Sequence, residues 1–216
     1  MIIIFSLVSL ALIFWYSNYI QNQFYVIVDF FNVLVTQHES LAILVFILSA
    51  TFGALISPLT NLPLVPFAVA IWGTVPTTIF LLIGWLIGDI IAYFIGRYFG
   101  LYIITKLISS KKIEEWSGMV KGHTNFFTAV VVRLALPAEL GYLFGFIRYN
   151  FWLYLLVTFI AELPFAVILT NVSKAVIFGE TQQFFGMIFL LVVIIVGVLI
   201  KMKKIKKKIC KHLQTN

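Results

Sequence analysis

Charges and helix breakers interrupt an apolar part of this chain in the segment Arg133-Leu-Ala-Leu-Pro137-Ala-Glu139-Leu-Gly141-Tyr-Leu-Phe-Gly145-Phe-Ile-Arg148. The flanking residues, 126–132 and 149–171, are hydrophobic enough to lie in a bilayer. Hydrocarbon tolerates a buried charge or a broken helix only where it faces protein or a water-filled cavity, because unsatisfied polar groups are costly there. We therefore predict that this segment lies at a functional centre within a membrane.

The composition indicates an integral membrane protein. The 216 residues are 62% hydrophobic and only 11% charged, with a mean hydropathy of +1.08, which no soluble single domain shows. The net charge of +7 arises at the C-terminal end, where seven of the fifteen basic residues follow residue 200: Lys201, Lys203, Lys204, Lys206, Lys207, Lys208 and Lys211. Such a tail is typical of a cytoplasmic anchor on anionic headgroups, and no aromatic-interleaved basic domain favours nucleic-acid binding.

Four apolar stretches are predicted to span the membrane, and these are Met1–Tyr16, Val75–Gly96, Phe151–Thr170 and Phe184–Ile200. Arg97–Asn125 is predicted to be a polar connection, and Asn171–Gln183 a short connection before the last span. Between the first two, Ser17–Ser40 alternates polar with apolar residues and has no Lys or Arg, which predicts an amphipathic segment at the outer interface. We divide the chain into this N-terminal region (1–40), a core domain (41–174), a C-terminal transmembrane helix (175–200) and a basic cytoplasmic tail (201–216).

Two further apolar segments are too short to cross the membrane. Leu41–Ile56 would form about 24 Å of helix, against a hydrocarbon core of about 30 Å, and so would fall short, as would Phe126–Leu136. Each is followed by breaks, at Pro63, Pro66 and Gly73 in the first case and at Pro137, Gly141 and Gly145 in the second. The pattern predicts two re-entrant helical hairpins.

Basic residues agree with this layout. The positive-inside rule places both Arg97–Asn125 and the lysine tail in the cytoplasm, and this holds only if each hairpin returns to the side from which it entered. The fold class expected is an all-α polytopic membrane protein with about four transmembrane helices and two oppositely oriented hairpins. Because each hairpin precedes a spanning helix with one acid, Asp89 or Glu162, the halves are typical of an inverted repeat with a site between them.

The candidate site residues are Arg133, Glu139, Glu162 and Asp89. Arg133 is suited to binding a phosphate through two parallel hydrogen bonds, or else to pairing with Glu139 or Glu162. The two glutamates are partners of Arg133, proton carriers, or neutral acids bonded to free backbone. Asp89 is the weakest candidate, because it lies beside a face of small residues whose helix packing alone would account for it: Gly84, Gly88, Ala92 and Gly96.

Four motifs carry a family resemblance, and these are Arg133-Leu…Pro137-Ala-Glu139-Leu…Tyr142…Gly145, Phe151…Ala161-Glu162-Leu163-Pro164, Pro63-Leu…Ala70…Trp72-Gly73 and Gly96-Arg97-Tyr98-Phe99-Gly100. The resemblance is to the VTT domain of the DedA superfamily, also called the SNARE-associated Golgi protein family. It extends from about Leu41 to Lys174. It implies two re-entrant hairpins and activity as a lipid scramblase or polyprenyl-phosphate flippase, with proton-linked transport discussed for some bacterial members.

We therefore expect a lipid transporter or scramblase that moves phospholipid or polyprenyl-phosphate headgroups through a polar centre. The alternatives are a proton-coupled carrier of small solutes or ions, and a non-transporting membrane scaffold. No nucleophile–base pair, metal-ligand set or phosphate-binding glycine loop is present in the sequence, so no enzyme, metal site or cofactor is predicted. The expected partners are membrane lipids, with anionic headgroups at the lysine tail, and homo-oligomer formation stays open. The expected location is a prokaryotic plasma membrane, with both termini cytoplasmic.

The predicted topology has a direct test in cysteine labelling. Cysteines placed at Ser110 and Thr215 are expected to resist impermeant thiol reagents in intact cells, because charge bias puts both positions inside. A cysteine at Gln23 is expected to label. Labelling at Ser110 from outside would contradict the two-hairpin layout.

Overall fold

A computed structural model describes residues 33–55, 64–107, 126–135 and 140–213. The chain divides into two compact units, Met1–Val45 and Phe46–Asn216. In the first unit the described residues 33–45 are helical apart from His38. The second unit holds the predicted site residues. Its helices, together with α3, which begins in the first unit, are α3 (Glu39–Leu55), α4 (Leu64–Trp72), α5 (Thr74–Leu107), α7 (Phe126–Ala135), α8 (Leu140–Phe146), α9 (Phe151–Phe178) and α10 (Thr181–Leu213).

Three of these helices are long and apolar enough to cross a membrane within the described part of the chain. The candidate spans are Thr74–Phe99 in α5, Phe151–Phe178 in α9 and Thr181–Lys203 in α10. They coincide with three of the four predicted spans, and the prediction of an all-helical membrane chain is confirmed in this respect. The fourth predicted span, Met1–Tyr16, lies outside the described residues, and the number of re-entrant hairpins stays a prediction.

The helices are longer than the sequence pattern indicated. The predicted polar connection Arg97–Asn125 is wrong at its start, because α5 continues to Leu107. The predicted connection Asn171–Gln183 is also wrong, because α9 runs on to Phe178 and α10 begins at Thr181. Within α9 the Asn171 side chain bonds to the Val167 carbonyl at 2.8 Å, and a polar side chain satisfied on its own helix does not end it. Helix α9 ends at Gly179, which has a φ of 70° and caps the helix in the left-handed conformation.

The predicted breaks have different outcomes. Gly73 separates α4 from α5 with a φ of 80°, which glycine adopts without strain. Pro66 is not a break, since it lies in the first turn of α4, where the missing N–H would have no helical partner. Gly141 and Gly145 are not breaks either, because both lie inside α8. Pro63 and Pro137 lie outside the described residues.

Glycine allows α5 and α8 to touch backbone to backbone. A Cβ on Gly96 would overlap the Tyr142 carbonyl, and a Cβ on Gly145 would overlap the Tyr93 carbonyl. Further along α5, Gly84 and Gly88 pack in the same way against Ala50 and Thr51 of α3. The predicted small-residue face is therefore confirmed, and it serves two neighbouring helices.

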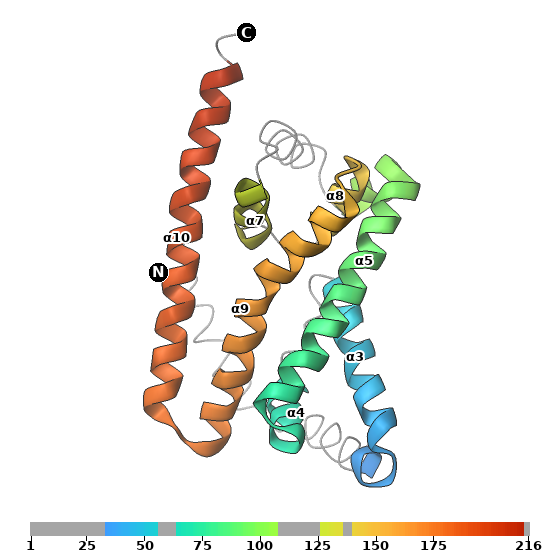
Figure 1. The fold of residues 1–216 in the computed structure, drawn as a ribbon, viewed down its shortest axis with the longest axis vertical. Helices are drawn as coiled ribbons and strands as arrows, with labels where there is room; N and C mark the ends of the chain where they lie inside the picture. The colour runs from blue at the N-terminus through green and yellow to red at the C-terminus, as the bar shows by residue number, and fades with distance from the viewer. Residues whose placement is uncertain (1–32, 56–63, 108–125, 136–139, 214–216) are drawn as a thin grey trace. The chain divides into compact units, whose positions relative to one another are not determined.

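The remaining contacts place α9 between α5 and α10, as Figure 1 shows. Helix α7 contacts α9 and α10, and α4 contacts α5 and α9. A buried cluster where α5, α7, α8 and α9 meet contains Tyr93, Val132, Leu143 and Tyr154. Asp89, Arg133 and Glu162, which are charged residues predicted from the sequence, lie beside this cluster.

Candidate functional site

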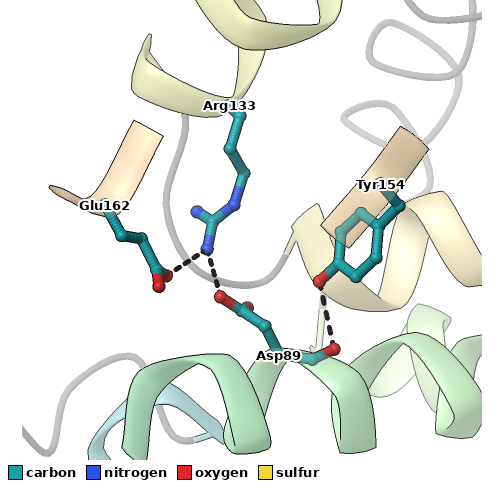
Figure 2. A network of polar contacts seen from close by, with 4 residues as sticks. All are labelled: Asp89, Arg133, Tyr154 and Glu162. Atoms are coloured by element: carbon teal, nitrogen blue, oxygen red, sulfur yellow. Dashed lines mark hydrogen bonds and ion pairs between the residues drawn. The ribbon is translucent and has the colours of Figure 1, made fainter. Parts of the chain in front are cut away.

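Three charged side chains from three helices meet inside the second unit. Arg133 reaches from α7 toward Asp89 of α5 and Glu162 of α9 (Figure 2). Its Nη2 atom donates to Asp89 Oδ2 at 2.6 Å and to Glu162 Oε1 at 2.8 Å. One guanidinium nitrogen therefore joins helices α5, α7 and α9.

The cluster is withdrawn from the surface. The side chains of Asp89, Arg133 and Glu162 are 1%, 7% and 12% exposed. Breaking such a buried pair by removing one partner typically costs about 3–5 kcal/mol, because the remaining charge is left without compensation. Removal of Arg133, the shared partner, is therefore expected to destabilise the fold, because it leaves two buried carboxylates without compensation.

Tyr154 holds the backbone beside Asp89. Its hydroxyl donates to the Asp89 carbonyl at 3.0 Å (Figure 2), and its ring stacks on Tyr93 with the centroids 4.9 Å apart. Gly141 of α8 packs against both residues, since a Cβ there would lie 3.0 Å from the Tyr154 hydroxyl and 3.3 Å from Asp89 Oδ1. Helix α8 thus approaches the charged cluster closely because residue 141 has no side chain.

Arg133 and Glu162 reach the cluster because of their positions along helices α7 and α9. Arg133 is in the last turn of α7, next to Val132, which is fully buried in the hydrophobic cluster that also contains Tyr93 and Tyr154. Helix α9 begins at an Asn150 cap, whose side-chain oxygen accepts from the backbone N–H groups of Trp152 and Leu153. That start, and the contact of α9 with α5, bring Glu162 to the level of Asp89.

The cluster retains unused hydrogen-bonding capacity. Among the residues that the structure describes, Asp89 Oδ1, Arg133 Nε and Glu162 Oε2 are buried without a hydrogen-bond partner. Two carboxylates also face one guanidinium, so the site carries excess negative charge when both acids are ionised. Buried polar atoms are normally hydrogen-bonded. Atoms that are not bonded can accept or donate to another group, so these features suit a site that binds a polar ligand.

The structure brings together three of the four predicted residues. Arg133 and Glu162 are paired as one of the alternatives predicted. Asp89, the weakest candidate in the sequence, makes the shortest contact. Glu139 lies outside the described residues. Sequence reasoning missed Tyr154, and the only signal for it was a tyrosine two turns before Glu162 on an apolar helix.

Comparison with known proteins identifies the family of this chain. The family model described as the VTT domain matches residues 41–175. No curated protein and no solved structure gives a significant match to the chain. The matched region covers more than half of the sequence and contains Asp89, Arg133 and Glu162. The chain therefore belongs to the VTT-domain family, the family of the DedA and SNARE-associated Golgi proteins.

Proposed function

We propose that this protein moves lipids across the membrane, as a transporter or scramblase of phospholipid or polyprenyl-phosphate headgroups. The observation that carries the proposal is the Asp89–Arg133–Glu162 cluster, which is buried between helices of spanning length. Charged groups within a membrane chain generally mark a pathway for a polar or charged substrate. The VTT-domain family, to which this chain belongs, is generally a family of transporter-type membrane proteins, which is compatible with this proposal.

Arg133 is the group that would hold a lipid phosphate. A guanidinium offers donors in a planar fork that matches two phosphate oxygens. In the structure both carboxylates bond to the same nitrogen, Nη2, and Nε has no hydrogen-bond partner among the described residues. A phosphate would therefore take Arg133 from one of its carboxylates while the other keeps the side chain in place.

A specific observation also favours a second candidate, a proton-coupled carrier. Two carboxylates share one guanidinium, and each has an oxygen without a partner in the described part of the chain. If the guanidinium turns to a substrate, the excess negative charge is best balanced by uptake of a proton or another cation. The same cluster would then couple substrate movement to a proton gradient.

A fluorescent-lipid flip assay in proteoliposomes, with and without a pH gradient, separates these functions. We expect the wild-type protein to accelerate flipping, and Glu162→Gln to slow it about tenfold or more, since a lost charge-assisted hydrogen bond is worth about 1.5–3 kcal/mol. Glu180→Gln is the control, because the half-exposed Glu180 side chain forms only a long, weak pair with Lys174, at 3.9 Å. Flipping that requires the pH gradient would favour the coupled carrier. No flipping in either condition would contradict lipid transport and leave the scaffold alternative.

A further inference from the structure

An open groove of about 480 Å³ lies between α5 and α9, and none of the three buried charged residues lines it. Its α5 wall extends from Thr74 to Leu86, and its α9 wall extends from Phe159 to Asn171. The helices run in opposite directions here, because Thr78 bonds to Thr170 whereas Tyr154 bonds to Asp89. Thr74 and Asn171 therefore lie at one end of the groove, and Leu86 and Phe159 lie at the other.

The groove offers little to a polar solute. Almost all of its lining is aliphatic or aromatic. The Thr78 hydroxyl is already engaged with the Thr74 carbonyl at 2.7 Å and with the Thr170 hydroxyl at 2.8 Å. The Asn171 amide nitrogen bonds to the Val167 carbonyl. A sugar or an ion would lose its water here without forming hydrogen bonds in exchange.

The surroundings of the groove are hydrocarbon, because both of its walls belong to helices of spanning length and composition. The wall from Thr74 to Leu86 rises about 18 Å along α5. This is slightly more than half of a hydrocarbon core of about 30 Å, and so it matches the depth of one leaflet. A groove of that length, open to the bilayer, has the dimensions and the apolar lining that suit a lipid tail.

The charged cluster adjoins the groove near its Leu86–Phe159 end. Leu86 lies one helical turn before Asp89 on α5, and Glu162 lies on α9 between Phe159 and Leu163, which both line the groove. A molecule that reaches along the groove and into the cluster must be apolar over most of its length and charged at one end. A membrane lipid has this form.

We propose that the α5–α9 groove binds one acyl chain of the lipid whose headgroup occupies the Asp89–Arg133–Glu162 cluster. This inference rests on the proposed lipid transport and adds the site of the tail. The groove keeps the tail beside the pathway while the headgroup exchanges contacts with Arg133.

Photocrosslinking in proteoliposomes tests the groove directly. The probe is a phosphatidylcholine with a diazirine on one acyl chain, mixed into phosphatidylcholine vesicles, and the adducts are located by peptide mass spectrometry. We expect adducts at Ile83 and Leu163 severalfold above those at Ile87. Ile83 and Ile87 are 41% and 39% exposed, so lipid that merely surrounds the protein would label them equally. Equal labelling would overturn the proposal.

A second measurement fills the groove. Ile83→Trp is expected to remove the excess of adducts at Leu163 and to slow flipping severalfold, whereas Ile87→Trp leaves both unchanged. A wild-type protein that flips lipids but shows no excess of adducts at Ile83 and Leu163 would reject the groove alone. A wild-type protein that shows the adduct pattern and does not flip lipids would reject the transport function instead. Unchanged adducts at Leu163 in Ile83→Trp would also count against the groove.

Discussion

Arg133→Gln is expected to produce the largest loss of lipid flipping of any single substitution in this protein. It removes the only cation seen between Asp89 and Glu162 among the described residues, and two buried carboxylates without a cation cost about 3–5 kcal/mol. Arg133→Lys is expected to fail nearly as badly, because an ammonium cannot reproduce the planar guanidinium fork. The measurement is the flip rate in proteoliposomes, together with the amount of folded protein recovered from membranes.

A neutral triple variant separates binding from folding. In Arg133→Gln with Asp89→Asn and Glu162→Gln, no buried charge of the cluster is left unpaired, so recovery of folded protein is expected to improve over Arg133→Gln alone. Flipping is expected to stay absent, because no guanidinium is left for the phosphate. If the triple variant flips lipids at the wild-type rate, the charges serve the fold and the headgroup-binding role is wrong.

Gly145→Ala is expected to be among the most destabilising single-methyl additions in the described chain. The new Cβ would overlap the Tyr93 carbonyl and lie 2.8 Å from the Arg97 nitrogen. Overpacking against movable side chains costs about 1–3 kcal/mol, and a backbone neighbour gives way less easily, so we expect a loss of about 3 kcal/mol or more. Thermal unfolding in detergent, followed by tryptophan fluorescence, measures the change.

Gly197→Ala is the matched control for this substitution. Gly197 lies in α10, where nothing described is within 4 Å of the added Cβ, and Ala in an exposed helix is favoured over Gly by about 1 kcal/mol. The control is therefore expected to keep or slightly raise the stability. A Gly145→Ala protein as stable as the wild type would show that α5 and α8 separate without cost.

Local sequence patterns predicted the parts of the fold that depend on local chemistry. The spans in α5, α9 and α10 follow from long apolar runs, and Gly73 from its place between two helices. Helix ends were predicted less well. The end of the apolar stretch at Thr170 predicts a connection from Asn171 onward, yet the Asn171 side chain bonds within α9. The satisfaction of a polar group by its own helix depends on side-chain geometry, which a hydropathy pattern does not contain.

The role of glycine required the three-dimensional neighbours. Gly141 and Gly145 are unfavourable in a helix on local propensity, which predicts breaks at both positions. In the structure they lie inside α8, because close packing against Tyr93 and Ala92 of α5 requires residues without a side chain. The stabilisation from packing two helices together outweighs the local cost of glycine, and no pattern within one helix can show that.

By itself, the sequence determined that this is a helical membrane chain of the VTT-domain family with charges buried near residue 133, since hydropathy and the cost of charge in hydrocarbon are properties of the residues. Only the tertiary structure decided that Arg133 pairs with both Asp89 and Glu162. These residues are 44 and 29 positions from Arg133 along the chain. Their meeting depends on the backbone contact of α5 with α8 and on the start of α9 at Asn150, and such long-range packing sets the distances between side chains that local patterns leave open.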